Sequence, residues 1–202
     1  MNTLNRFLLS QRSGLNKIDT RLFEIINTLP HPAALNTFME WLATVTNRGD
    51  GWLVAALVAV WLDKKSERGA GYRFLGRTTL ILWLATLTVE YPLKLLFHRP
   101  RPFVQIAHAQ LVGAKPRHFS FPSGHSAASF ASAWLLRKRY PRWRWLHFSM
   151  ALLVAFNRVY LGAHFPGDVV AGAFSGVGLA ALYSRLLPLW KVKELGNTPP
   201  QS

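Results

Sequence analysis

The stretch from Trp145 to Trp190 reads WLHFSMALLVAFNRVYLGAHFPGDVVAGAFSGVGLAALYSRLLPLW and contains two apolar runs joined by a short connection. The runs cover residues 145–159 and 169–190, and each is long enough, alone or with its flanks, to supply the roughly 20 residues that cross the hydrocarbon core of a bilayer. The connection contains Pro166 and Gly167, which are typical of the start of a helix. This stretch therefore predicts a pair of helices, each a candidate membrane span.

The composition of the whole chain also favours a membrane protein. Its 202 residues are 50% hydrophobic and 16% charged, which describes one compact domain rather than a disordered chain. The formal net charge of +15 would suggest nucleic acid, but the basic residues lie in short clusters between apolar runs rich in Trp and Phe. Because the chain has no cysteine, disulfides, thiolate metal sites and cysteine nucleophiles are excluded. Histidine, carboxylate and hydroxyl groups are left as the candidate reactive groups.

Further candidate spans lie upstream. Three apolar stretches cover residues 51–62, 78–97 and 126–136. Residues 18–29 and 33–46 are amphipathic, and we expect one of these segments to lie in the membrane interface and the other to be a marginal span. The predicted fold is all-α, a polytopic membrane helix bundle of about five to six transmembrane helices plus an interfacial N-terminal helix. We expect one domain over residues 1–195, a disordered tail over 196–202, and no cleavable signal peptide.

The basic clusters predict how the bundle is oriented, because short loops rich in Lys and Arg stay on the cytoplasmic side. Such clusters follow Leu62 and Leu136, and the tail after Trp190 is also basic. The connections expected on the opposite, extracytoplasmic side are residues 48–50, 97–121 and 161–168. Topology does not explain why the second of these is itself basic, with four cations and no acid: Arg99, Arg101, Lys115 and Arg117.

Three separate segments carry cationic and histidine side chains at predicted helix ends on this same side. They run from Lys94 to Pro102, from Phe121 to Ser126 and from Asn157 to Asp168. Together they resemble the type 2 phosphatidic acid phosphatase (PAP2) superfamily. That family's pattern is Lys, six residues, Arg-Pro; then Pro-Ser-Gly-His; then Ser-Arg, five residues, His, three residues, Asp. The matching residues are Lys94, Arg101, Pro102, Pro122, Ser123, Gly124, His125, Arg158, His164 and Asp168, and only Asn157 departs, standing where the family has Ser.

Elementary chemistry gives these residues a phosphate-binding role as well. A phosphate group carries about two negative charges near neutral pH, so its site needs fixed donors and cations. Lys94, Arg101 and Arg158 supply the cations. Ser123 directly precedes an apolar helix and can cap it, while the free backbone N–H groups at that helix start face an anion. Gly124 allows the backbone to come close.

The resemblance implies roles for two histidines. His164 attacks phosphorus and forms a phosphohistidine, while His125 protonates the leaving oxygen and then accepts a proton from water. Asp168 lies four residues after His164, across a helix start, and is expected to orient its imidazole. We expect the Asn157 amide to donate to a phosphate oxygen in place of the family's Ser hydroxyl, so that the affinity for phosphate changes but binding is not lost. No metal and no cofactor is implied.

Several alternatives compete with this interpretation. The same motifs fit a phosphotransferase with another acceptor, and they also resemble soluble vanadium haloperoxidases, against which the apolar spans argue. A metal site formed by His125, His164 and Asp168 is disfavoured because three nearby cations would repel a divalent ion. Glu90 lies four residues before Lys94, a spacing that also fits an ion pair that merely neutralises Lys94 in the membrane. A non-enzymatic binder of anionic lipids is a further alternative. However, the strongest basic cluster of the chain, from Arg137 to Arg144, is already explained by the predicted membrane topology.

We therefore expect an integral membrane lipid phosphatase of the bacterial inner membrane, with its site facing the extracytoplasmic side. The first-ranked substrates are a polyprenyl diphosphate, such as undecaprenyl diphosphate, and phosphatidylglycerol phosphate. Lipid A phosphates and phosphatidic acid are further candidates, all of them used in the cell envelope. The expected partners are the lipid substrate and membrane lipids; no nucleic acid and no obligate protein partner is expected.

Overall fold

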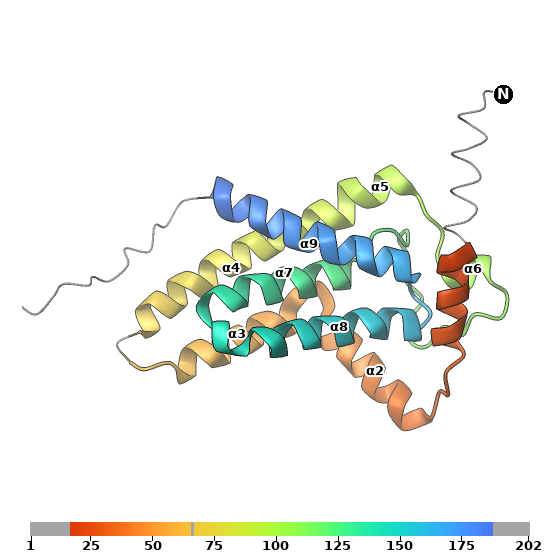
Figure 1. Ribbon diagram of the computed structural model, residues 1–202, viewed down its shortest axis with the longest axis horizontal. Coiled ribbons are helices and arrows are strands. Elements are labelled where there is room, and N and C mark those ends of the chain that lie inside the picture. Colours follow the sequence, from red (N-terminus) through yellow and green to blue (C-terminus); the bar gives the residue numbers. More distant parts are fainter. Residues whose placement is uncertain (1–16, 66, 188–202) are drawn as a thin grey trace, which may run out of the picture.

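The computed structural model describes residues 17–65 and 67–187, which are built from helices joined mostly by short connections, with one long connection over residues 106–123 (Figure 1). The all-α prediction is confirmed for these residues. The basic tail and residues 196–202 lie outside the described part. Residues 17–27 are helical and are followed by α2 (Ala33–Val45), α3 (Asp50–Leu62), α4 (Arg68–Thr88), α5 (Lys94–Phe97), α6 (Pro102–Gln105), α7 (Gly124–Arg139), α8 (Arg144–Tyr160) and α9 (Pro166–Leu186).

Each of the five predicted apolar stretches forms a helix, but their lengths differ. Among the described residues, two helical stretches are long and apolar enough to cross a membrane, Arg68–Gln105 and Pro166–Leu186. The helices α3, α7 and α8 contain 13, 16 and 17 residues, fewer than a simple span needs. Five to six crossings therefore stay a prediction.

Helix α7 lies at the centre of the bundle, where α4, α8 and α9 pack against it (Figure 1). Its sequence explains this position, because small side chains surround the helix and allow neighbouring helices to approach closely. The buried ones include Ala127, Ala128, Ser129, Ala131, Ser132 and Ala133.

The contact of α9 with α7 depends on two glycines four residues apart. A Cβ atom on Gly172 would lie 2.4 Å from the carbonyl oxygen of Ser123, and one on Gly176 would lie 2.1 Å from that of Ala127. Only glycine permits this approach. It brings the starts of both helices together, where the Ser123 amide donates to the carbonyl of Asp168 at 2.9 Å. The second and third motif segments are thereby joined.

The predicted helix over residues 78–97 is interrupted. Between α4 and α5 the chain forms a π-helical turn, Val89–Leu93, that contains Pro92. Proline has no N–H to continue the α-helical hydrogen-bond pattern, which explains the wider turn. Glu90 lies in this turn, and Lys94 follows it.

The N-terminal helical residues 17–27 are amphipathic, as predicted. Ile18, Leu22 and Ile25 are exposed, whereas Phe23 and Asn27 are buried against the rest of the protein. An exposed apolar stripe on one face and a packed face on the other suit a helix lying along a membrane interface.

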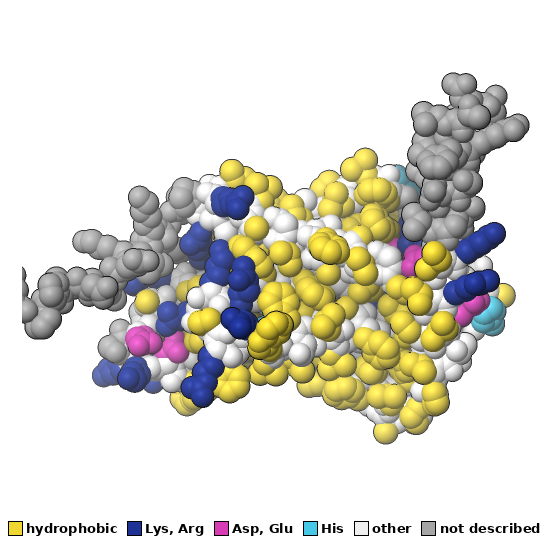
Figure 2. Space-filling model, viewed as in Figure 1, with side chains coloured by type: hydrophobic (Ala, Val, Ile, Leu, Met, Phe, Trp, Pro, Cys, Tyr) yellow, Lys and Arg dark blue, Asp and Glu magenta, His cyan; other side chains and the backbone are white. Residues whose placement is uncertain are grey.

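Charge divides the surface into zones. Figure 2 shows a largely hydrophobic middle and a group of Lys and Arg side chains at the end formed by the starts of α4 and α8 and the end of α7. The motif segments lie at the other ends of the same helices, at the start of α7 and the end of α8.

Candidate active site

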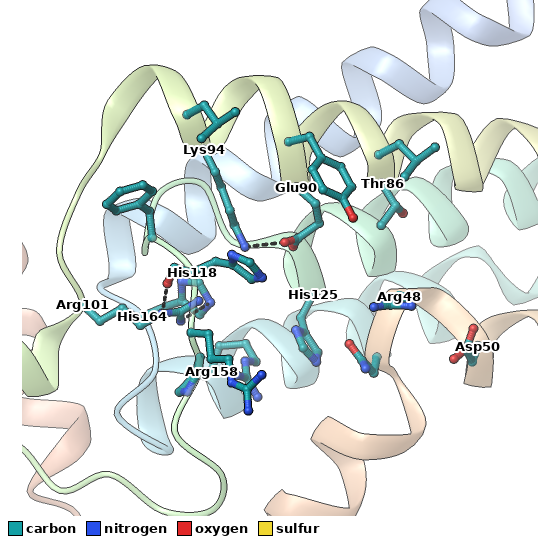
Figure 3. A pocket seen from close by; sticks show the side chains of 18 of the residues that line it. Arg48, Asp50, Thr86, Glu90, Lys94, Arg101, His118, His125, Arg158 and His164 are labelled. Carbon is teal, nitrogen blue, oxygen red and sulfur yellow. Dashed lines mark hydrogen bonds and ion pairs between the residues drawn. The ribbon is translucent and has the colours of Figure 1, made fainter.

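One large cavity, of about 1340 Å³, brings the three motif segments together. Figure 3 shows how their side chains converge from α5, α7, α8 and the adjoining loops. Six of the nine predicted site residues line this cavity: Lys94, Arg101, Gly124, His125, Arg158 and His164. The other three, Ser123, Asn157 and Asp168, are fully buried behind its wall.

The hydrogen bonds of His164 define its tautomer. Its Nε2 atom lies 3.2 Å from Nη1 of Arg101, and a guanidinium group can only donate. Nε2 is therefore the acceptor, and the ring proton sits on Nδ1. This atom faces Oδ2 of Asp168 at 3.7 Å, which is longer than a hydrogen bond. A neutral imidazole with a lone pair on Nε2 is the form that a nucleophile requires.

Burial keeps His164 neutral. Its side chain is enclosed in the loop between α8 and α9, and this burial lowers its pKa to about 3. Asp168 opposes the shift, while the positive charges of Arg101 and Arg158 add to it. Near neutral pH the His164 imidazole therefore needs no deprotonation to present a lone pair.

The carboxylate of Asp168 is held on several sides. Oδ1 accepts from Arg99 at 2.7 Å, and Oδ2 accepts from the Phe165 amide at 2.9 Å and from the Ser120 hydroxyl. Sequence reasoning did not assign Arg99 or Ser120 to the site. The available signal was that Arg99 belongs to a basic segment that topology does not explain.

The three motif cations differ in their partners. Lys94 donates to Glu90 at 2.6 Å, so the predicted ion pair is formed, and it lies on the cavity wall. Arg101 is anchored by the carbonyls of His118 and Ala163, at 2.7 and 2.8 Å. Together they hold fixed positive charge at one end of the cavity.

Arg158 is the motif cation with a buried, unsatisfied hydrogen-bond donor. It is only 8% exposed, and its Nε is buried without a hydrogen-bond partner among the described residues. Burying an unpaired guanidinium is costly, so such a group marks a site for a negatively charged ligand.

The start of α7 supplies His125 and the helix cap. The Nε2 atom of His125 lies 3.1 Å from the carbonyl of Ala43 and carries a hydrogen, because a carbonyl only accepts. Ser123 caps the helix as expected, since its hydroxyl accepts from the Ser126 amide at 3.4 Å. A Cβ on Gly124 would lie 1.8 Å from Oε1 of Glu90, so in this structure the group that comes close to Gly124 is the Glu90 carboxylate.

Asn157 faces away from the cavity. Its Nδ2 donates to the backbone carbonyl of Met39 at 2.7 Å and ties α8 to α2. The next residue, Arg158, lines the cavity, whereas Asn157 does not. In this structure the amide nitrogen is bonded to a backbone carbonyl instead of opening to the cavity, so the expected donation to phosphate has no support here and we propose a packing role for Asn157.

The metal-site alternative has no support in the geometry. Within residues 17–65 and 67–187, no three His, Cys, Asp or Glu side chains come together as a possible metal site. His125, His164 and Asp168 do not form one.

Comparison with known proteins decides the family. A family model described as the PAP2 superfamily matches residues 74–191. The chain belongs to the PAP2 superfamily. It is 29% identical over 187 residues to an undecaprenyl-diphosphatase of Sulfolobus acidocaldarius, covering 92% of this chain and 84% of that one.

Two solved PAP2 structures have a similar fold. Aquifex aeolicus LpxE superposes with a TM-score of 0.65 at 29% identity, over 82% of this chain and 93% of that one. A transmembrane PAP2 phosphatidylglycerolphosphate phosphatase of Bacillus subtilis superposes with a TM-score of 0.60 at 24% identity, over 91% and 90%. The resemblance seen in the sequence motifs is thus confirmed, and the protein is a PAP2 phosphatase.

Proposed function

We propose that this protein hydrolyses a lipid diphosphate, a polyprenyl diphosphate in first place, through a phosphohistidine on His164. The observation that carries the proposal is the neutral, buried imidazole of His164, which lines the same cavity as three motif cations and a second histidine.

The reaction follows from these positions in two steps. Nε2 of His164 attacks the terminal phosphorus, the bond from phosphorus to the leaving oxygen breaks, and His125, entering the step as the imidazolium, gives that oxygen a proton and becomes neutral. Water then attacks the phosphohistidine, His125 takes its proton, and the P–N bond breaks to release phosphate. Arg101, Lys94 and Arg158 stabilise the non-bridging oxygens in both transition states.

The shape of the cavity supports a lipid substrate. Beyond the histidines it runs along α4 past Leu87, Trp83 and Leu82. A headgroup can occupy the cationic end while an apolar chain lies along this wall, which suits a substrate that stays in the bilayer. We assign the cationic end to the extracytoplasmic side of a multi-pass protein, because the basic clusters lie at the other ends of the helices.

Two observations favour a diphosphate over a monoester. The undecaprenyl-diphosphatase relative aligns with almost the whole chain. The cavity also holds cations beyond those of the motifs, namely Arg48, Lys115 and Arg117, which can bind a second phosphoryl group. Phosphatidylglycerol phosphate, phosphatidic acid and lipid A phosphates are the competing substrates, and transfer to an acceptor other than water is the competing reaction.

A panel assay tests this proposal. Purified protein in detergent is given undecaprenyl diphosphate and the three competing lipids, and phosphate release is measured with His164→Ala as the blank. We expect the largest kcat/KM for the diphosphate. A monoester lipid hydrolysed faster would overturn the substrate assignment, and turnover by His164→Ala would overturn the mechanism.

A further inference from the structure

A single arginine outside the assigned site residues joins two carboxylates. Arg99 donates through Nη1 to Asp168 at 2.7 Å and through Nη2 to Asp19 at 2.6 Å. The Asp168 side chain is fully buried, and those of Arg99 and Asp19 are 21% and 14% exposed. In such surroundings a two-pronged ion pair is far less screened than one at the surface.

Asp19 also contacts α9 directly. Its Oδ1 accepts from the Gly167 amide at 2.7 Å, in the first turn of that helix. A Cβ on Gly167 would lie 2.9 Å from Oδ2 of Asp19, so a side chain at this position would require the carboxylate to shift. A residue of the N-terminal helix thus satisfies a backbone N–H one position before Asp168.

Arg99 is fixed on its remaining sides as well. Its guanidinium lies over the ring of Phe165, 4.2 Å from the centroid, and its carbonyl accepts from the Ser120 amide at 2.8 Å. Ser120 in turn donates its hydroxyl to Asp168. Arg99 therefore has little freedom to follow a moving partner.

We propose that Arg99 and Asp19 are positioning residues, which hold Asp168, and through it His164, in the orientation that the reaction needs. This inference rests on the proposed role of His164. Arg99 occupies one oxygen of the carboxylate, while Ser120 and a backbone amide occupy the other, so the Asp168 side chain cannot turn away from the imidazole.

The consequence is that the N-terminal helix is part of the active site's support. Asp19, Phe23 and Asn27 are spaced four residues apart on one helix face. Phe23 packs on Phe165 with ring centroids 5.5 Å apart, and Asn27 donates to the carbonyl of Tyr160 at 2.9 Å. All three residues therefore contact the segments that carry or flank His164.

The variants that test the inference are Arg99→Gln, Arg99→Lys and Asp19→Asn. Loss of a supporting partner of this kind typically costs about 10- to 100-fold, so we expect Arg99→Gln to lower kcat by that factor with little change in KM. Lysine keeps the charge but cannot reach both carboxylates, so Arg99→Lys should recover part of the rate. Asp19→Asn should fall between wild type and Arg99→Gln. Normal kcat in both Arg99 variants would overturn the inference.

A second ion pair provides the matched control. Arg139 donates to Asp63 at 2.6 Å with side chains 19% and 15% exposed, at the other end of α7. Arg139→Gln removes a pair of similar geometry and burial far from the cavity. Its kcat should stay within about twofold of wild type, since distant sites act independently. A matching loss of kcat in Arg139→Gln would show that Arg99 acts only through general stability, which contradicts a positioning role.

The decisive comparison uses Asp168→Asn. If Arg99 acts through Asp168, adding Arg99→Gln to Asp168→Asn should lower kcat no further, whereas independent structural damage would multiply the two losses. Losses that multiply would overturn the inference.

The variant His164→Ala distinguishes failure of the proposed function from failure of the positioning role. A fully active His164→Ala would contradict the proposed function. An inactive His164→Ala together with a normal kcat in Arg99→Gln would contradict the positioning role alone. If Arg99→Gln does not fold, the same comparison is made with Asp19→Asn.

Discussion

At the scale of single residues, His164 lies between a cation on one ring nitrogen and a carboxylate near the other. Arg101 lies 3.2 Å from Nε2, and Asp168 lies 3.7 Å from Nδ1. The first keeps Nε2 unprotonated and the second favours a proton on Nδ1. The tautomer of His164 is therefore set by its two neighbours, before any substrate binds.

The first prediction concerns this protonation state. Because the pKa of His164 is about 3 in the folded protein and that of an unfolded histidine is about 6.5, the imidazole should stay neutral from pH 5 to 8. Between pH 3 and 6.5 the unfolded state binds more protons, so this residue makes the free energy of unfolding fall as pH falls through that range. Carbon-13 NMR of labelled histidines, with His164→Gln to assign the signal, measures the titration. A midpoint between pH 6 and 7 would contradict the burial argument.

The second prediction separates packing from binding at Asn157. Replacing it with Ser removes the donor to the buried Met39 carbonyl and should lower the free energy of unfolding by about 1–3 kcal/mol. KM should stay near the wild-type value, because the side chain does not line the cavity. Thermal unfolding and substrate kinetics on the same sample check both statements. A large rise in KM with unchanged stability would restore the phosphate contact expected from the sequence.

The residues that sequence reasoning assigned and those it missed differ in a physical way. Lys94, His125 and His164 belong to spaced motifs, so residue type and order were enough to find them. Asp19 and Arg99 matter through contacts between segments about 80 positions apart. Such contacts depend on how helices pack, which a local pattern does not encode.

At the scale of elements, the crossing of α9 over α7 determines whether the motifs meet. Both glycines at this crossing approach the backbone of α7 closely, and the same contact joins the starts of the two helices. The sequence predicted both helices from apolar length, and the G-x-x-x-G spacing of Gly172 and Gly176 within an apolar stretch was an available signal for their close contact that the prediction did not use. Likewise, it did not predict the π-helical turn that carries Glu90, although Pro92 was a visible signal for a break.

The third prediction tests this crossing. Gly176→Ala should destabilise the protein by about 1–3 kcal/mol and lower kcat, because the added methyl pushes α9 away from α7. Gly178→Ala is the control on the same helix, since nothing lies within 4 Å of its Cβ position. That variant should keep full activity. Thermal unfolding and phosphate release compare the pair, and equal behaviour of the two variants would refute the importance of the close contact.

At the scale of the whole molecule, the basic clusters that follow Leu62 and Leu136 lie at the end of the bundle opposite the site. The sequence predicted this separation, and within the described residues the structure places these two clusters at the far ends of helices whose other ends carry the site (Figures 1 and 2). The positive-inside rule did not explain the basic residues of segment 97–121. In the structure, Arg99 contacts Asp168 and Arg101 contacts His164. Lys115 and Arg117 line the cavity. These contacts account for basic residues on the side where topology would not place them.

The fourth prediction tests the orientation. Because the chain has no cysteine, single cysteines can be introduced at exposed Ala107, near the site, and at exposed Lys65, at the basic end. In intact bacterial cells a membrane-impermeant maleimide should label Ala107→Cys and spare Lys65→Cys. Permeabilised cells, in which both should react, give the control. The reverse labelling pattern would place the site in the cytoplasm.

The most direct test of the catalytic assignment is to trap the intermediate. Purified protein is mixed with undecaprenyl diphosphate labelled with phosphorus-32 in its terminal phosphate, quenched in alkali within one turnover, and digested for peptide mapping. We predict an acid-labile phosphoryl group on the peptide that contains His164, absent from His164→Ala. Turnover without such an adduct, or a phosphoryl group attached to another residue, would contradict the role of His164 as the nucleophile.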